Sequence, residues 1–257
     1  MRVDLAADLG EGFGDYRMGD DAALLEIVTS ANIACGFHAG DPRIMHATVA
    51  ECVRRGVGVG AHPGLPDRVG FGRRTMELTP HEVRTDVLYQ LGALSAFATA
   101  HGTRLRHVTP HGQLGNVAAV RPDWAAAVVE AVTDFDQTLA VVALDGALTA
   151  AARSAGLPVA VLGLADRAYQ EDGTLVRRSS PGAVLTDHGQ VAERVVRMVT
   201  DGTVEAITGR VVELRPDTVL LHGDTPGAVD LARTVRAALR SAGVAIEPLA
   251  SVLAARA

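Results

Sequence analysis

Seven short apolar runs, each followed by polar residues and then by a helix-forming stretch, are the feature that most constrains the fold of this chain. The runs lie at residues 3–9, 33–35, 57–61, 105–109, 139–144, 159–164 and 218–221. Apolar strands of this length joined by helices are typical of parallel β/α units, whose sheet is covered on both faces. The alternation therefore predicts an α/β fold, a seven-stranded parallel (β/α) barrel.

Helix signals between these runs support the alternation. Pro42 stands at the first position of a helix that we expect to end at Arg55, with Gly56 following it. Residues 79–82 form a capping box, Thr-Pro-His-Glu, for a helix that runs to about Ala100. Further helices are expected at about 20–29, 123–133, 147–155, 187–200 and 226–242, with extra short strands within 204–214.

Length and composition narrow the class of protein. The 257 residues suit one α/β barrel, so we expect a single domain over residues 1–257, and a hydrophobic fraction of 48% supports a large core. A net charge of −6 and an aromatic content of 4% argue against a nucleic-acid partner. Strand-like sequence begins at Arg2 and no apolar run is long enough to cross a bilayer. We therefore expect no signal peptide, no membrane partner and a cytoplasmic location.

The basic residues exclude two kinds of chemistry. All 24 of them are arginine. A Walker-type ATP site and a Schiff-base mechanism both require lysine, so this chain has neither. The two cysteines, Cys35 and Cys52, do not form a disulfide framework, and we expect both to be packed thiols.

Ionisable side chains follow every one of the seven strands. They are Asp8 and Glu11, His38 and Asp41, His62, His111, Asp145, Asp166 and Arg167, and His222 and Asp224. The carboxyl ends of parallel barrel strands meet at one face, which is where the active sites of such barrels lie. The pattern therefore predicts a convergent catalytic site for a small-molecule substrate.

Some polar residues fit a different explanation. Asp145 precedes a helix and is expected to cap it. His46, His81, His101 and His188 lie in helices or turns, where we expect them to be solvated. The glycines at 10, 12 and 14 resemble a dinucleotide-binding loop only superficially, because the third is at the wrong spacing.

The histidines and carboxylates at the strand ends allow two kinds of chemistry. They could ligate a divalent metal ion, which would polarise an amide carbonyl and lower the pKa of water. No closely spaced ligand motif decides for a metal. The alternative is metal-free acid–base catalysis by a carboxylate–imidazole pair.

Several motifs connect the chain to a known family. They are DLAADLGE at 4–11, SANIACGFHAGD at 30–41, GAHP at 60–63, PDR at 66–68, FGR at 71–73, PHG at 110–112 with Asn116, ADRAY at 165–169, DGTL at 172–175 and LHGD at 221–224. On these motifs, which span nearly the whole chain, it resembles the LamB/YcsF family.

The resemblance implies a barrel like that of the glycoside hydrolase/deacetylase superfamily. It also implies ATP-dependent hydrolytic opening of 5-oxo-L-proline, a cyclic amide, to L-glutamate, together with two partner chains, 5-oxoprolinase subunits B and C. Because this chain has no lysine for a phosphate loop, we expect the partners to use the ATP. The barrel then binds the ring and directs water.

Within this picture the matched positions receive roles. The catalytic residues are expected to be Asp8, Glu11, His38, Asp41, His62 and His111. Substrate binding is expected at Asn32, Arg68, Asn116, Asp166, Arg167, Arg178, His222 and Asp224. An arginine guanidinium suits the substrate carboxylate because it makes a bidentate contact.

Three positions differ from the residues usual in the family. Ala6 stands for asparagine, Thr109 for lysine and Gly115 for tyrosine, which alters the polarity of the barrel mouth. Two other functions stay open: a stand-alone metal-dependent amidase or deacetylase acting on a related small amide, and a non-catalytic binding barrel. The sequence also leaves open the metal, and whether the chain forms a homo-oligomer.

Overall fold

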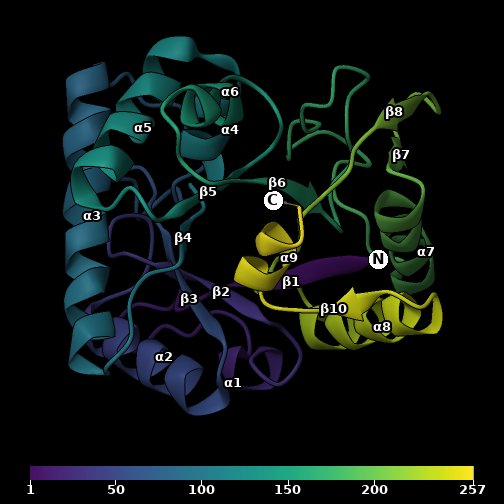
Figure 1. The fold of residues 1–257 in the computed structure, drawn as a ribbon, viewed down its shortest axis with the longest axis horizontal. Helices are drawn as coiled ribbons and strands as arrows, with labels where there is room; N and C mark the ends of the chain where they lie inside the picture. The colour runs from purple at the N-terminus through teal and green to yellow at the C-terminus, as the bar shows by residue number, and fades with distance from the viewer. Residues whose placement is uncertain (257) are drawn as a thin grey trace.

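A closed barrel of seven parallel strands forms the centre of the computed structural model, which describes residues 1–256 (Figure 1). In order around the barrel the strands are β1 (Arg2–Leu9), β2 (Ser30–Ala34), β3 (Gly58–His62), β4 (His107–Val108), β5 (Ala140–Ala143), β6 (Val159–Leu164) and β9 (Thr218–Leu221). β9 pairs with both β6 and β1, and this closes the sheet. The predicted fold is confirmed, while Ala257, the last residue of the predicted domain, lies outside the described residues.

Helices cover the outside of the barrel (Figure 1). They are α1 (Asp21–Leu24), α2 (Pro42–Arg55), α3 (Pro80–Ala100), α4 (Gly112–Val120), α5 (Pro122–Phe135), α6 (Ala147–Ser154), α7 (His188–Thr200) and α8 (Ala228–Ser241). Two predicted boundaries are confirmed in detail. Thr79 and Glu82 form the capping box of α3, and Gly56 ends α2 with a φ of 71°. A large cluster of buried apolar side chains fills the layer between these helices and the strands.

The structure departs from the expected elements in four places. α1 has only four residues, whereas a helix was expected over 20–29, and α4 was not expected. The extra strands are confirmed as an antiparallel pair, β7 (Thr203–Glu205) and β8 (Val211–Glu213). Beyond α8, β10 (Ala245–Ile246) pairs with the start of β1, and α9 (Leu249–Ala254) follows it. Elements as short as α1 and β10 leave little periodic pattern in a sequence.

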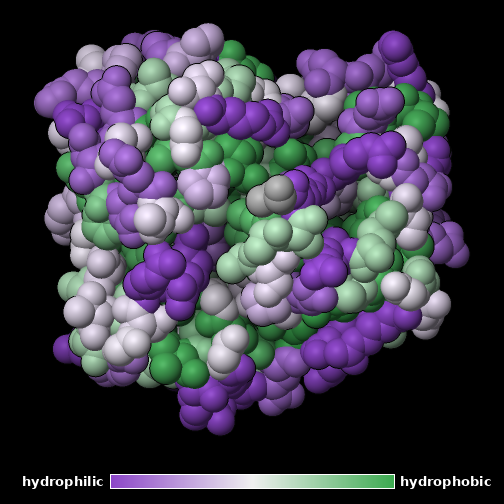
Figure 2. Space-filling model, viewed as in Figure 1, coloured by the Kyte–Doolittle hydropathy of each residue, from purple (hydrophilic) through white to green (hydrophobic). Residues whose placement is uncertain are grey.

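α9 lies close to the amino end of the barrel interior. It packs against β1, where the carboxylate of Asp4 accepts hydrogen bonds from Ser30 (2.7 Å) and Thr218 (2.6 Å). Burial raises the pKa of Asp4. Figure 2 shows hydrophilic residues over most of this face, with hydrophobic residues gathered near its centre.

The side chains that fill the barrel differ between its two sides. The interior of β1–β4, which we call the polar half, contains the buried side chains of Asp4, Asp8, Ser30, Asn32, His62 and His107. The interior of β5 and β6, which we call the apolar half, contains Ala140, Val142, Ala160, Leu162 and Leu164. The two halves face each other across the barrel mouth.

None of the helices in the described part of the chain combines the length and the apolar character that crossing a membrane would require.

Candidate active site

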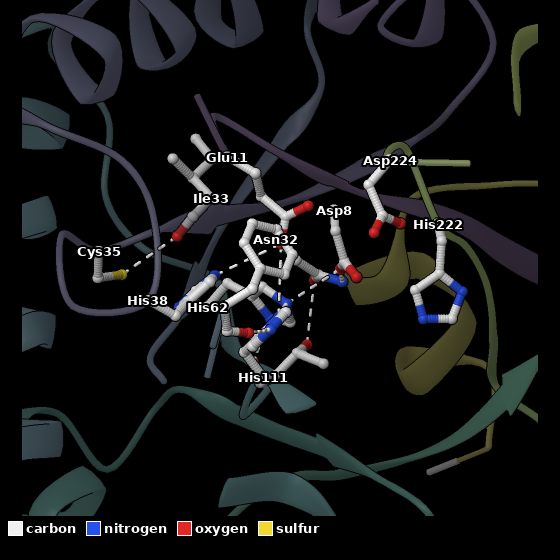
Figure 3. A network of polar contacts seen from close by, with 12 residues as sticks. Asp8, Glu11, Asn32, Ile33, Cys35, His38, His62, His111, His222 and Asp224 are labelled. Atoms are coloured by element: carbon white, nitrogen blue, oxygen red, sulfur yellow. Dashed lines mark hydrogen bonds and ion pairs between the residues drawn. The ribbon is translucent and has the colours of Figure 1, made fainter. Parts of the chain in front are cut away.

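Three histidines and a glutamate meet at the carboxyl ends of the first four strands (Figure 3). His62 is the last residue of β3, while Glu11, His38 and His111 follow β1, β2 and β4. One side-chain nitrogen or oxygen of each lies within 4.8 Å of the others, and all four residues are buried. We call these residues the histidine cluster. The structure thus brings together four of the six residues predicted to be catalytic.

Glycines make room for His38. Gly36 leads into its loop with a φ of 100°, a conformation that favours glycine. Two glycines from the following loop pack against the imidazole: a Cβ on Gly64 would lie 2.4 Å from His38 Nδ1, and one on Gly72 would lie 2.8 Å from His38 Cβ. Any side chain at these positions would push the ring out of the cluster.

Backbone carbonyls fix the orientation of the other two rings. His62 Nδ1 lies 2.6 Å from the carbonyl oxygen of Thr109, and His111 Nε2 lies 2.9 Å from that of Phe71. Phe71 has a φ of 54°, and within residues 1–256 it is the one non-glycine residue with a positive φ. Such strain is often found at functional sites, and here it accompanies a carbonyl directed at His111.

Asn32 organises the polar half beneath the cluster. Its Nδ2 donates to Asp8 Oδ1 at 2.9 Å, while its Oδ1 accepts from Thr109 Oγ1 (3.0 Å) and lies 2.8 Å from His107 Nε2. Asp8 Oδ1 in turn lies 3.4 Å from His62 Nε2. Asn32 therefore positions a carboxylate directly beside the histidine cluster.

Neighbouring groups give the two buried carboxyl groups different charge states. It acts to raise the pKa of Asp8, but the attraction of His62 and His222 and the hydrogen bond from Asn32 outweigh it and hold that pKa well below its usual range. Burial raises the pKa of Glu11 well above its usual value, and the nearby charges of Asp8 and Asp224 add to the effect. Asp8 is thus a carboxylate at neutral pH, whereas Glu11 retains a proton more readily.

The imidazoles of His38 and His111 are neutral. Burial lowers the pKa of each well below the usual histidine value, and neighbouring histidines lower both further. Neutral imidazole can accept a proton or ligate a metal ion, and both roles need the free lone pair.

A second polar group lies on the far side of Asp8 from the histidine cluster (Figure 3). His222 Nδ1 lies 2.7 Å from Asp166 Oδ1. Although burial acts to lower it, the pKa of His222 is raised, because the attraction of Asp166 outweighs burial. Asp224 is paired with two arginines: Arg73 at 2.9 Å and Arg178 at 3.7 Å. These groups provide both signs of charge at the mouth.

Two members of the histidine cluster, His62 and His111, line a cavity of about 950 Å³, whereas Glu11 and His38 do not. Asp8, His62 and His111 line one side of it, and the apolar half lines the other with Val142, Leu162 and Leu164. Asn116, Arg73, Arg167, Arg178 and His222 also line it. A small molecule in this cavity can contact charged groups on one side and hydrocarbon on the other.

Two residues predicted for the site lie elsewhere. Asp41 caps α2: its Oδ1 accepts from the backbone N–H of Arg43 (2.8 Å) and Ile44 (3.0 Å), and its Oδ2 accepts from Gly14 (2.8 Å). Arg68 donates to the carbonyl of Gly36 and stacks over the Phe13 ring. Both line a separate cavity of about 670 Å³. Both oxygens of Asp41 are thus already engaged by backbone donors.

Three further expectations are resolved by contacts. Arg167 lines the main cavity, but its guanidinium donates to the carbonyls of Val176 (2.6 Å) and Ala183 (3.1 Å). The expected cap at Asp145 is wrong: Gly146 is the N-cap, and Asp145 accepts from Thr149 Oγ1 (2.8 Å) and Arg153 instead. Cys35 and Cys52 are packed thiols as expected, and burial raises the pKa of each to about 12.

The sequence interpretation missed two residues of this region. Arg73, which pairs with Asp224, stands in the FGR motif at 71–73, so its motif was a usable signal. His107 lies inside β4, and no turn or strand end marks it. It fills the space above Gly60, where a Cβ would lie 2.0 Å from its Nε2.

The three departures from the family pattern also lie in this region. Ala6 is buried in the barrel, and Thr109 contacts both Asn32 and His62. A Cβ on Gly115 would lie 2.6 Å from the Pro110 carbonyl oxygen.

Comparisons with known proteins agree with this architecture. The sequence model of the LamB/YcsF family matches residues 3–254. This chain belongs to the LamB/YcsF family. It is 51% identical over 250 residues to the A subunit of 5-oxoprolinase from Pyrococcus furiosus, covering 97% of this chain and 98% of that one. It is also 51% identical over 252 residues to the protein of the same name from Rhodopseudomonas palustris, covering 97% and 99%.

Solved structures place the family's fold among related barrels. The crystal structure of the lactam utilization protein from Thermus thermophilus matches with a TM-score of 0.91 at 47% identity, covering 96% of this chain and 100% of that one. A structure named T48 deacetylase with substrate matches with a TM-score of 0.51 at 12% identity, over 99% and 92%. The second likeness concerns the fold alone, and it agrees with the expected deacetylase-like barrel.

Proposed function

We propose that this chain is the ring-opening component of an ATP-dependent 5-oxoprolinase, which hydrolyses 5-oxo-L-proline to L-glutamate together with partner subunits B and C. The observation that carries the proposal is the identity of about half of all residues, over nearly full length, with chains named as the A subunit of 5-oxoprolinase. The structural relative is named for lactam utilisation, and a lactam is a cyclic amide.

The division of labour follows from the chemistry of an amide. Resonance makes the lactam carbonyl a poor target for water, and transfer of a phosphoryl group from ATP to its oxygen makes the carbon easier to attack. This chain contains no lysine and therefore no Walker-type phosphate loop. ATP-dependent activation accordingly belongs to subunits B and C, and ring opening belongs to this barrel.

The polar half suits the attack of water. Asp8 is a carboxylate next to His62, so it can orient that imidazole and stabilise the positive charge that develops when the ring takes a proton. Glu11, whose pKa is raised, can deliver a proton to the ring nitrogen as the carbon–nitrogen bond breaks. His38 and His111 complete the group that holds the water.

The rest of the cavity suits the remainder of the substrate. The α-carboxylate pairs with Arg178 and Arg73, which already hold Asp224, and the ring methylenes lie against Leu162 and Leu164. Asn116 and His222 line the same cavity. Asn32 and Asp166 do not line it, and they act through their contacts with Asp8 and His222. Asp41, Arg68 and Arg167 act on the backbone: they hold the loop of His38 and the loop after β6 in place.

The deciding experiment is a 5-oxoproline hydrolysis assay on the purified chain, with ATP, with and without subunits B and C. Glutamate should form only when both partners and ATP are present, and formation should fall at least about a hundredfold with His62→Asn. His81→Asn, on an exposed histidine, is the matched control and should keep full activity.

Two results would contradict the proposal and identify its competitors. ATP-independent hydrolysis of a small amide by the isolated chain would assign it to a stand-alone amidase or deacetylase. Binding of 5-oxoproline without turnover in the complete complex would assign it to a non-catalytic binding barrel.

A further inference from the structure

We propose that the histidine cluster is a binding site for one divalent transition-metal ion of the Zn²⁺ type, held by Glu11, His62 and His111 and completed by His38. The proposal concerns the same site as the ring-opening function but does not depend on it. When the ion is bound, Glu11 and His62 act as its ligands in place of the acid–base roles described above. It rests on the orientation of the rings and on the buried atoms between them, and its test needs no substrate.

The backbone contacts decide which nitrogen of each ring carries its proton. A carbonyl oxygen can only accept, so His62 must donate from Nδ1 to Thr109 and His111 must donate from Nε2 to Phe71. A neutral imidazole has one proton, so the lone pairs of His62 Nε2 and His111 Nδ1 then face each other at 2.9 Å. Two facing lone pairs repel, and a positive charge between them removes the repulsion. That charge is either one shared proton or a metal ion.

The remaining atoms of the cluster favour the metal ion. Glu11 Oε1 lies 3.4 Å from His111 Nδ1 and 3.4 Å from His38 Nε2. Neither Glu11 Oε1 nor either nitrogen of His38 has a hydrogen-bond partner among the described residues, although Glu11 is 4% exposed and His38 0%. A buried polar group without a hydrogen-bond partner destabilises the folded state. A proton shared by His62 and His111 leaves these groups unpaired, whereas an ion at the centre contacts them all.

The spacing and chemistry of the four ligands suit zinc. Two ligand atoms, each about 2.1 Å from a tetrahedral ion, lie about 3.4 Å apart. The Glu11–His111 distance equals this value, the Glu11–His38 distance equals it before any rotation of His38, and the His62–His111 distance of 2.9 Å is about half an ångström shorter. Three imidazoles and one carboxylate are a typical zinc donor set, whereas Mg²⁺ and Ca²⁺ prefer oxygen ligands. The carbonyls of Thr109 and Phe71 act as outer partners that orient ligand histidines.

His38 is the most weakly placed ligand. Its ring stacks on His111 with an interplanar angle of 4° and a centroid distance of 3.8 Å. An ion in the plane of the His111 ring therefore lies out of the plane of His38, and His38 must rotate to bind it. Its two unpartnered nitrogens leave no hydrogen bond to break on rotation. Loss of His38 should thus weaken binding less than loss of His111.

The test is the binding of ZnCl₂ to the full chain after treatment with a chelator, followed by calorimetry and by elemental analysis of the dialysed protein. We expect one zinc ion per chain. His111→Ala and Glu11→Gln should each lower the affinity at least about tenfold, and His38→Ala should lower it less. The control is His46→Ala, because His46 Nδ1 lies 3.2 Å from His101 Nε2 in an exposed pair with no role in the cluster. Affinity in His46→Ala should equal that of the wild type.

A second measurement separates loss of binding from loss of the fold. Co²⁺ gives visible absorption bands that depend on its ligands, and the wild-type spectrum should change in Glu11→Gln, whose side chain has nearly the same shape as glutamate. Circular dichroism checks that each variant is folded. The proposal is overturned if the wild type binds no zinc, if His111→Ala and Glu11→Gln bind it as tightly as the wild type, or if His46→Ala removes it. The shared proton would then be the better explanation of the 2.9 Å contact.

Discussion

The polar and apolar halves of the barrel are built from the same parallel strands but bury opposite kinds of side chain. In the polar half, β1–β4 bury Asp8, Asn32 and His107 in one connected set of hydrogen bonds. In the apolar half, β5 and β6 present Val142, Leu162 and Leu164 to the same cavity. A buried polar group is stable only when it is hydrogen-bonded, so the polar half has to be a network, whereas the apolar half needs only packing. Inside the barrel, a connected set of buried polar groups thus lies on one side, and β5 and β6 present hydrocarbon on the other.

The largest expected effect is on the polar half. In the reconstituted complex, with 5-oxoproline as the substrate, His62→Asn should lower kcat about 10²- to 10⁴-fold, because a positioned acid–base group contributes this much. The substitution keeps a polar side chain of similar reach, so the free energy of unfolding should change far less than the activity. Steady-state kinetics and urea unfolding of the same preparation measure both. A kcat within threefold of the wild type would remove His62 from the proposed chemistry.

The apolar half should respond in the opposite way. Leu162 is buried and lines the cavity, so Leu162→Ala should lower the free energy of unfolding by about 2–3 kcal/mol and raise KM. The kcat should stay within a few-fold of the wild type, since no charged group is lost. Val211→Ala, at a position 51% exposed, is the control and should alter neither quantity. A fall in kcat as large as that of His62→Asn would contradict the assignment of the chemical step to the polar half alone.

The polar half should also make stability depend on pH through His107. Burial, with a smaller contribution from His62, lowers its pKa from 6.5 to about 4. Below about pH 6.5 His107 binds a proton in the unfolded chain but stays neutral in the folded chain. The free energy of unfolding should therefore fall as the pH drops towards 4. The loss amounts to about 3 kcal/mol from this residue.

Urea unfolding between pH 4 and pH 7 measures this slope. His107→Asn should be less stable at pH 7, because Asn32 loses a partner, and its stability should change less over the same range. His81→Asn, at an exposed position, should keep the wild-type slope. Equal slopes for the wild type and His107→Asn would contradict the assignment.

The smallest expected effect lies outside both halves, at Asp41. Asp41→Ala removes the cap of α2 and should lower the free energy of unfolding by about 1 kcal/mol. Asp41→Asn should restore most of it, because asparagine is also a good cap, and should retain activity. A catalytic role for Asp41 would instead appear as loss of kcat in Asp41→Asn at unchanged stability.

Much of the fold could be predicted because long elements carry strong local signals. The strands at 159–164 and 218–221 were predicted with their observed limits, and the capping box at Thr79 marked the start of α3. α4 was missed because it contains Gly112 and Gly115, and glycines are more typical of turns than of helices. α9 was missed because it has only six residues, which is too few for a clear helical period.

The order of strands and helices, the polar residues at the strand ends and the absence of lysine all follow from the sequence alone. Which of those polar residues meet was decided by the tertiary structure. Every residue of β1 after Arg2 is buried, so its sequence pattern does not reveal that Asp8 faces the cavity while Leu9 faces the helices. Asp41 and His38 stand three residues apart in one motif, yet local backbone donors engage the first and leave the second free to join the histidine cluster. The orientation of those histidines depends on carbonyls from residues 71 and 109, and only the closed barrel brings these groups together.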